Sequence, residues 1–345
     1  MTRLLSTALC ASLLALASPV AADPIRAVVY TGSEALVTHV LSLPGMPEEA
    51  QDEQARFEAA RGYRSLPGTE GMRDVSFRPV LTFDPNVNGG LPGDRLQVAG
   101  LTFLVDPEYV RKSGILIRME AAAVMRENIS PGLALDLRAR GMVGYSPQHQ
   151  VGKLAVDLQG CLRYQANPSR YFHGCTGLNH QRVKLGHQTE LHAAIGATQA
   201  FGAGRSLHAV TGEIGVRRVF SQGSTPWSQG YVRVSTATAL QNGTAIVTSL
   251  ELGQAVRDVQ ATGLRASVGL MRDIAGRPTS ISVFYSRSQG GMFLGEARRD
   301  QTFGVGVTRE MSDKLSISAS ISRTRSNASL FNAGPSLGMN VSYRF

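Results

Sequence analysis

Residues 315–322 read LSISASIS and residues 336–345 read SLGMNVSYRF, and these two stretches decide the fold. In both, apolar residues occupy every second position, and small or polar residues occupy the positions between them. Successive side chains of a β-strand point to opposite faces of a sheet, so a period of two indicates strands with one apolar and one polar face. The end of the chain is therefore predicted to be β-structure with two chemically different surfaces.

The same alternation continues upstream to about residue 75 and divides this part of the chain into candidate strands. There are fourteen of them, at residues 75–83, 95–105, 114–125, 131–144, 150–165, 182–200, 207–219, 229–240, 244–256, 262–271, 278–288, 300–309, 314–324 and 335–345. Strands of soluble sandwiches average about five or six residues, whereas tilted membrane-crossing strands need about 9 to 11, as most of these have. The lengths predict an all-β, closed antiparallel transmembrane β-barrel, with a soluble β-sandwich as the alternative.

The connections between the candidate strands offer an independent criterion. Bacterial barrels alternate short periplasmic turns with longer outer loops. Counting from the first strand places the short turns 201–206, 241–244 and 311–313 on the periplasmic side. The outer side receives the long connections 165–181, 220–228, 289–299 and 325–334, together with two short ones, 126–130 and 257–261. The pattern largely follows the rule for a membrane barrel.

The composition excludes several classes of protein. With 43% hydrophobic and 18% charged residues, the chain is too apolar for disorder and too polar for a bundle of membrane helices. The formal net charge is +9, but the arginines are spread along the whole chain. Nucleic-acid-binding proteins concentrate such charge in a patch or an arm. We therefore expect no nucleic-acid partner.

The N-terminal part divides into a leader and an arm. Residues 1–22 contain a basic start, an apolar stretch and small residues at the end, which is the pattern of a signal peptide. Residues 23–74 are predicted to form a periplasmic arm that is partly helical, with Ser33 capping a first helix and Pro47 opening a second. Residues 75–345 then form the barrel, located in the outer membrane of a Gram-negative cell.

Charged side chains on the polar face of the strands must point into the barrel. An arginine on the lipid face at the bilayer midplane costs roughly 2–4 kcal/mol, whereas a lumenal arginine is hydrated and paired. The lumen-facing charges predicted on this basis are Arg78, Arg118, Glu120, Asp136, Arg138, Arg140, Asp157, Arg217 and Glu251. Opposite signs on neighbouring strands predict ion-pair ladders in a wet interior, and the excess of arginine favours a mild preference for anions.

Cys161 and Cys175 are the two cysteines that remain once the leader is removed. In an oxidising periplasm, an isolated pair fourteen positions apart indicates a disulfide. We expect it at the outer end of the barrel, where it gates the mouth, contacts a partner, or only stabilises a loop by about 3 kcal/mol. His173 and His180 lie nearby without a recognisable zinc spacing, so no metal and no cofactor is expected.

The sequence does not support a catalytic site. Glu190 and His192 share a face of the predicted strand, but His187 falls on the opposite face. No G-x-S-x-G motif accompanies them to supply a nucleophile. Scattered polar residues of a wet lumen explain these side chains, and we predict that the protein is not an enzyme.

The chain ends in Tyr343, Arg344 and Phe345. An aromatic final residue, preceded by alternating apolar residues, is what the barrel-assembly machinery recognises in outer-membrane proteins. We predict that Tyr343 and Phe345 form this signal. The expected partners of the barrel are therefore outer-membrane lipid and the assembly machinery.

Short motifs carry a resemblance to a known family. Residues 78–90 read RPVLTFDPNVNGG and resemble the opening of the barrel in the surface lipoprotein assembly modifier family, with Pro85 where that family has a serine. Residues 323–331, RTRSNASLF, and the closing residues 341–345, VSYRF, are similar to its last hairpin. The resemblance covers residues 75–345 and implies a fourteen-stranded barrel that moves lipoproteins or related soluble cargo across the outer membrane.

The family's periplasmic helical-repeat domain has no counterpart here, because residues 23–74 hold at most one repeat of about 34 residues. The first hypothesis for function is translocation or surface assembly of a lipoprotein or secreted protein, through the lumen or through the seam between the first and last strands. The alternative is a porin-type diffusion channel for small solutes, which the mixed charges of the lumen indicate.

Overall fold

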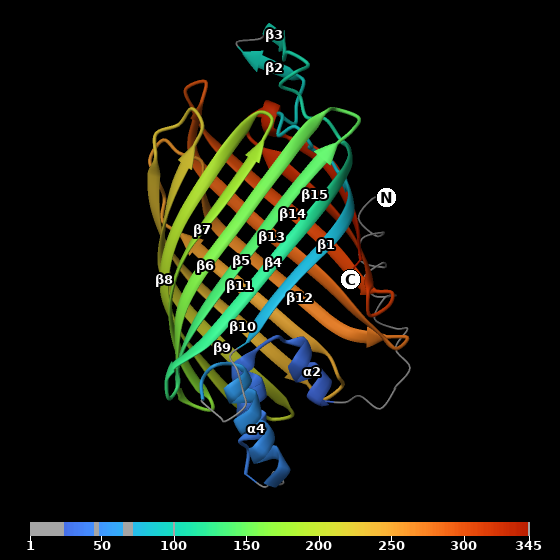
Figure 1. Cartoon of the computed structure of the whole chain (residues 1–345). Coiled ribbons are helices and arrows are strands. Elements are labelled where there is room, and N and C mark those ends of the chain that lie inside the picture. The colour runs from blue at the N-terminus through green and yellow to red at the C-terminus, as the bar shows by residue number, and fades with distance from the viewer. Residues whose placement is uncertain (1–23, 45–47, 65–71, 99–100, 344–345) are drawn as a thin grey trace.

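The computed structural model describes residues 24–44, 48–64, 72–98 and 101–343. The predicted signal peptide lies outside these described residues. No helix in the described ranges is long and apolar enough to cross a membrane. Figure 1 shows a tall barrel with short helices at one end and a small hairpin at the other.

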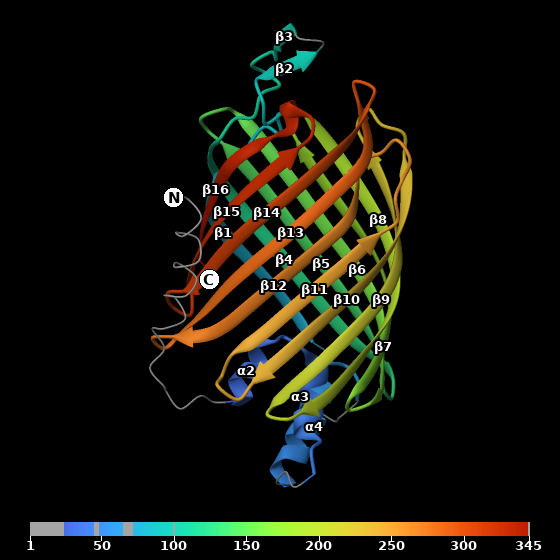
Figure 2. The same ribbon diagram turned by 180° about the vertical axis from the view of Figure 1, so that it is seen from behind.

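Fourteen antiparallel strands close into this barrel within the described residues, and β1 completes the ring by pairing with both β4 and β16 (Figures 1 and 2). The predicted closed antiparallel β-barrel is therefore confirmed. The strands are β1 (Arg73–Asp84), β4 (Gly114–Ser130), β5 (Leu133–Ser146), β6 (Val151–Asn167), β7 (Arg170–Val183), β8 (Gly186–Ala203), β9 (Ser206–Ser221), β10 (Trp227–Leu240), β11 (Ala245–Gly253), β12 (Ala261–Ile274), β13 (Arg277–Phe293), β14 (Glu296–Glu310), β15 (Leu315–Ser326) and β16 (Ala333–Tyr343).

Two of the predicted elements are wrong, although the number of strands is right. Residues 95–105 do not contribute to the barrel, because they contain β2 (Arg95–Val98) and β3 (Leu101–Leu104), which form a separate hairpin. Residues 165–181, predicted as an outer loop, contain a tight turn and most of β7. The sequence of β7, RYFHGCTGLNHQRV, has glycines and polar residues on both faces, so it lacks the regular apolar alternation that marks its neighbours.

Because one predicted strand is absent from the barrel and one barrel strand was not predicted, the total of fourteen strands is unchanged. The turns between them, however, lie on the opposite side of the membrane from the side predicted. Residues 126–130, predicted as an outer turn, are the end of β4. The turn that follows lies beside the N-terminal arm, because the N–H of Gly132 donates to the carbonyl of Tyr63 at 2.8 Å. From β8 onward, the predicted sides agree with the structure.

Apolar side chains cover the outside of the barrel. Val75, Phe77, Ile117, Ile195 and Ile214 are all more than half exposed, although a soluble protein would bury such a continuous apolar surface. Lipid is the environment in which a closed barrel with this belt is stable, since neighbouring strands of a closed ring satisfy each other's backbone hydrogen bonds. The barrel is therefore an outer-membrane barrel.

The two ends of the barrel differ in their connections. The turns at one end are short: 131–132, 168–169, 204–205, 241–244, 275–276 and 311–314. The other end includes the longer connections 85–113, 222–226, 254–260 and 327–332. Short turns face the periplasm in bacterial barrels, so the first end is periplasmic and the second is extracellular.

Three helices precede the barrel in the described part of the chain: α2 (Pro24–Tyr30), α3 (Glu34–Leu41) and α4 (Glu48–Ala60). The last two correspond to the predicted helices, and the Ser33 hydroxyl caps α3 by accepting from the N–H of Leu36. The seven-residue α2 was not predicted from the sequence. Helices α2 and α3 pack on strands from β8 to β12 at the periplasmic mouth, and α4 projects away from it (Figure 2).

The seam between β1 and β16 is the shortest strand contact of the ring within the described residues. Residues 80–83 of β1 pair with residues 339–342 of β16, whereas the full length of β1 pairs with β4. The periplasmic half of β1 thus extends beyond the described end of β16.

Packing inside the wall depends on glycine at particular positions. Phe284 of β13 faces Gly304 of β14 in register, on the lumenal side. A Cβ atom at Gly304 would lie 2.2 Å from a ring carbon of Phe284, closer than any real contact. The ring therefore packs directly on the backbone of β14.

Gly304→Val is expected to destabilise the barrel by about 1–3 kcal/mol, because the added side chain must displace the Phe284 ring. Thermal loss of the folded, heat-modifiable band on denaturing gels measures this effect. Gly141→Val is the matched control, since no heavy atom lies within 4 Å of a Cβ added at Gly141. Equal thermal stability of the two variants would contradict the packing argument.

Candidate functional site

The periplasmic end of the lumen is shaped to receive helices. Its wall carries small residues at inward positions, which leave space inside the ring, and α2 and α3 fill that space with apolar side chains. The buried wall residues of this cluster are Ala134, Tyr171, Ala200, Ala209 and Ala239. The buried helical residues are Ala27, Val28, Ala35 and Leu36. We call residues 24–41 the plug.

An ion-pair network joins the plug to the wall. Glu34, the first residue of α3, accepts a hydrogen bond from Arg126 of β4 at 2.7 Å. Arg126 has a side chain that is 1% exposed, and it also pairs with Asp136 of β5. Asp136 pairs in turn with Arg138 and Arg163, each at 3.1 Å. A buried guanidinium that loses a charged partner is costly, so this network holds the start of α3 in place.

The arm groups of this network have shifted pKa values. Burial acts to raise the pKa of Glu34, but the guanidinium groups of Arg126 and Arg163 outweigh it, and the pKa lies below its usual range. The hydroxyl of Tyr63 lies 3.3 Å from the Glu34 carboxylate and donates to it. Burial, reinforced by the charge of Glu34, raises the pKa of Tyr63 to about 12. At neutral pH the carboxylate is therefore charged and the phenol keeps its proton.

Further contacts attach the plug at other points of the periplasmic mouth. On α2, Arg26 and Tyr30 bind the Asp273 carboxylate of β12 at 2.9 and 2.5 Å. On α3, the Nδ1 atom of His39 lies 2.8 Å from the hydroxyl of Ser169, in the turn between β6 and β7. The plug is thus held on β4, on β12 and on the turn between β6 and β7.

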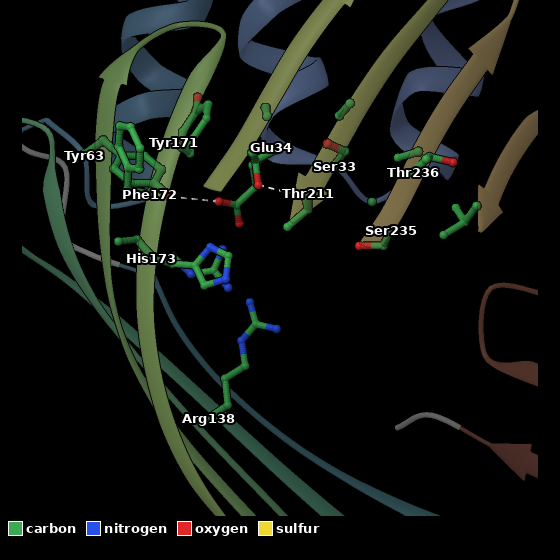
Figure 3. Close-up of a pocket in the computed structure, with 17 residues that line it drawn as sticks. Ser33, Glu34, Tyr63, Arg138, Tyr171, Phe172, His173, Thr211, Ser235 and Thr236 are labelled. Atoms are coloured by element: carbon green, nitrogen blue, oxygen red, sulfur yellow. Dashed lines mark hydrogen bonds between the residues drawn. The ribbon is translucent and has the colours of Figure 1, made fainter. Parts of the chain in front are cut away.

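A cavity of about 280 Å³ lies on the lumenal side of the plug. The beginning of α3 forms part of its lining, together with residues of β5 to β11. Figure 3 shows Arg138 and His173 extending toward Glu34 at this cavity. Arg163 also lines it, so guanidinium groups face the space directly beside the plug.

A second network lines the lumen from β7 to β11. Glu213 lies 3.4 Å from His173 and 3.1 Å from Arg233. Arg233 also binds Glu251 at 2.5 Å, and Glu251 pairs with Arg217. Positive and negative groups alternate across neighbouring strands, so this wall is polar and its charges largely cancel.

The opposite wall, from β13 to β16, has a different chemistry. Its lumenal positions are mostly hydroxyl residues and glycine: Ser280, Ser282, Ser286, Thr302, Gly304, Gly306, Thr308, Ser318, Ser320, Ser322, Thr324, Ser336, Gly338 and Ser342. Hydroxyls of neighbouring strands bond to each other, as in Thr302 with Thr324 at 2.9 Å. The lumen therefore has one wall rich in charges, on which the plug sits, and one wall of mostly small hydrophilic residues, whose charged groups Arg298, Asp300 and Glu310 lie near the ends of β14.

The connection 85–113 covers part of the extracellular mouth. Lys153, on the lumenal face of β6, donates to the carboxylate of Asp84 at 2.6 Å and to the carbonyl of Asn86 at 2.7 Å. The carbonyl of Asn88 accepts from the N–H of Leu185, in the turn between β7 and β8, at 3.2 Å. The motif DPNVNGG thus anchors this loop across the mouth from β1 to β8.

The strand register shows where the predicted lumenal charges lie. Asp136, Arg138, Arg217 and Glu251 belong to the two networks described above. Two further pairs of opposite charge lie across adjacent strands, Arg78 opposite Glu120 and Arg140 opposite Asp157. Arg118 lies 3.3 Å from Glu120, two residues along the same strand β4.

The disulfide between Cys161 and Cys175 is confirmed, but its expected position is wrong. The two cysteines face each other in register within the β6–β7 hairpin, whose turn is periplasmic. The bond therefore braces the barrel wall and does not lie at the outer mouth, because the predicted outer loop is a strand.

The predicted assembly signal is only partly described. Tyr343 is the last described residue of β16 and pairs with Leu315. Phe345 lies outside the described residues, so the signal stays a prediction.

Sequence reasoning missed the residues that hold the plug. Residue alternation places Arg126 in an outer turn and Glu34 in the periplasmic arm, whereas the structure places Arg126 on β4 and Glu34 at the start of α3. One signal was available: alanine occurs at inward positions near several short turns, at Ala200, Ala209 and Ala239. Small residues there indicate that something else occupies the lumen.

No family model matches the chain, and no curated protein matches it. Among solved structures it is similar to the outer membrane channel DcaP of Acinetobacter baumannii, with a TM-score of 0.45, 11% identity, and coverage of 82% of this chain and 99% of that one. It is also similar to OccAB3 of the same organism, with a TM-score of 0.41, 7% identity and coverage of 79% and 98%. Similarity at this level carries no inference about transport. Membership of the surface lipoprotein assembly modifier family stays a prediction.

Glu34→Gln is expected to loosen the plug, because Arg126 loses a charged partner at a cost of about 1–3 kcal/mol. Amide hydrogens of residues 24–41 should then exchange roughly tenfold faster at neutral pH, as hydrogen–deuterium exchange mass spectrometry would show. Glu53→Gln on the exposed face of α4 is the control. Unchanged exchange in the Glu34 variant would rule out this role of the carboxylate.

The same pair of proteins tests the pH dependence. The lowered pKa of Glu34 means that its contribution to docking is complete above the pKa of a free carboxyl, about 4.3, and is lost as the pH falls through the lowered value. The difference in exchange between wild type and Glu34→Gln should therefore persist at pH 5 and shrink below about pH 4.

Proposed function

We propose that this barrel is a porin-type diffusion channel for small hydrophilic solutes, and that the plug limits flow through it. The observation that carries the proposal is the division of the lumen into two walls. The plug is seated on the charged wall, where its contacts gather on β8 to β12. The hydroxyl-rich wall of β13 to β16 offers a hydrophilic surface along which a hydrated solute can pass.

The charges at the plug favour anions as the solute. Four guanidinium groups, of Arg61, Arg126, Arg138 and Arg163, surround the two carboxylates of Glu34 and Asp136. The excess positive charge lies at the cavity beside the plug, where a passing solute comes close to it. Rings of cationic side chains select for anions in pores.

Removing residues 24–41 is expected to raise the single-channel conductance severalfold and to keep its preference for anions. Planar-bilayer recording of wild-type and shortened proteins would measure both, with heat-modifiability on gels as the control for folding. If neither protein conducts ions in the bilayer, or if both conduct equally, the channel proposal is overturned.

A second candidate is the export of a lipoprotein or secreted protein, and the short seam between β1 and β16 favours it. A seam held by few pairs opens at lower cost than the others, and the free edges can pair with a strand of the cargo. This function is the one that the sequence motifs shared with the surface lipoprotein assembly modifier family imply.

A lock across the seam distinguishes the two candidates. Thr82 and Asn340 are register partners, so Thr82→Cys with Asn340→Cys should form a disulfide between β1 and β16. A diffusion channel should keep its conductance when the lock is oxidised. Loss of surface display of a cargo lipoprotein on oxidation, restored by reduction, would favour the export function instead.

A further inference from the structure

A group of arginines lies on the outer surface of the barrel, at the extracellular ends of β13 to β15. The group consists of Arg287, Arg299, Arg323 and Arg325, which we call the arginine patch. On β15, Arg323 and Arg325 flank Thr324, whose hydroxyl bonds to Thr302 inside the lumen. Side chains alternate along a strand, so both arginines point outward.

The strand register places the arginine patch at the extracellular edge of the apolar belt. Arg287, Gln301 and Arg325 form one row across three adjacent strands. Strands are spaced by about 4.8 Å, so the Cα atoms of Arg287 and Arg325 are roughly 10 Å apart.

The next row toward the membrane centre contains Tyr285, Phe303 and Arg323, and the row below it contains Val283, Val305 and Ile321. Aromatic residues mark the boundary between hydrocarbon and headgroups in membrane barrels. The patch therefore lies at headgroup level.

The charges of the patch are not neutralised by the protein. Within the described residues, none of the four guanidinium groups makes an ion pair or a hydrogen bond, and the Nε atom of Arg287 is shielded from solvent without a partner. The outer surface at the periplasmic end differs, because Arg73 pairs with Glu127 at 2.6 Å and Arg277 with Asp313 at 3.4 Å. Four like charges with no acidic partner indicate a site for an external anion.

We propose that the arginine patch binds the phosphate groups of an anionic lipid headgroup in the outer leaflet. Guanidinium groups bind phosphate oxygens in bidentate fashion, which favours arginine over lysine at such sites. The rows beneath the patch supply aromatic and aliphatic surface for acyl chains. A free phosphate ion would use the guanidinium groups but not this surface, so the combination fits a lipid.

The test uses the folded barrel in detergent and native mass spectrometry, with bis-phosphorylated lipid A as the probe. The triple variant Arg287→Gln, Arg323→Gln, Arg325→Gln should bind it about 100-fold more weakly, since each basic residue near a membrane surface contributes about fivefold. The control carries Arg272→Gln, Arg277→Gln and Arg309→Gln at the periplasmic ends of β12 to β14, with the same loss of charge. Its binding should stay within about twofold of wild type.

Each alternative has its own outcome. Equal loss in the control variant would show attraction to net charge only, and unchanged binding by the triple variant would overturn the proposal. Equal binding of dephosphorylated lipid A would exclude phosphate recognition, and full competition by equimolar inorganic phosphate would exclude a lipid site. If the triple variant does not fold, the single variant Arg325→Gln should still lose about fivefold, and no loss there would refute the site.

Discussion

The structure depends on one constraint: a strand in lipid must have every backbone hydrogen bond satisfied by another strand. Closure of the ring through β1 and β16 meets this requirement except along the periplasmic half of β1, which extends beyond the described end of β16. Closure also divides each strand into a face toward hydrocarbon and a face toward water. Charged residues can then exist only inside or at the two rims. Both the ion-pair networks of the lumen and the arginine patch follow from this division.

The charged groups of the lumen hold the structure together, whatever their effect on transport. Asp136 forms ion pairs with three guanidinium groups, and one of them, Arg126, also pairs with Glu34, the first residue of α3. The charged groups that keep the wall polar therefore also position the plug. Because the wall of β13 to β16 carries few such charges, the plug packs against the charged wall and leaves the hydroxyl-rich wall uncovered.

Much of the fold could be predicted from residue alternation, and the exceptions have physical reasons. Strands such as β15 alternate serine with aliphatic residues, so both faces are readable. Strand β7 places glycine, threonine and histidine on its lipid side, and its inward face carries a cysteine, so neither face has a clear pattern. Docking of the plug was not predictable from periodicity, because Glu34 and Arg126 are 92 residues apart and meet only in the folded barrel.

The attachment of α2 to Asp273 has a consequence for biogenesis. Helix α2 precedes every described strand in the chain and so is synthesised before them, yet it binds β12, which lies about 240 residues further along. Helix α2 can therefore bind Asp273 only after most of the barrel wall has formed in the bilayer.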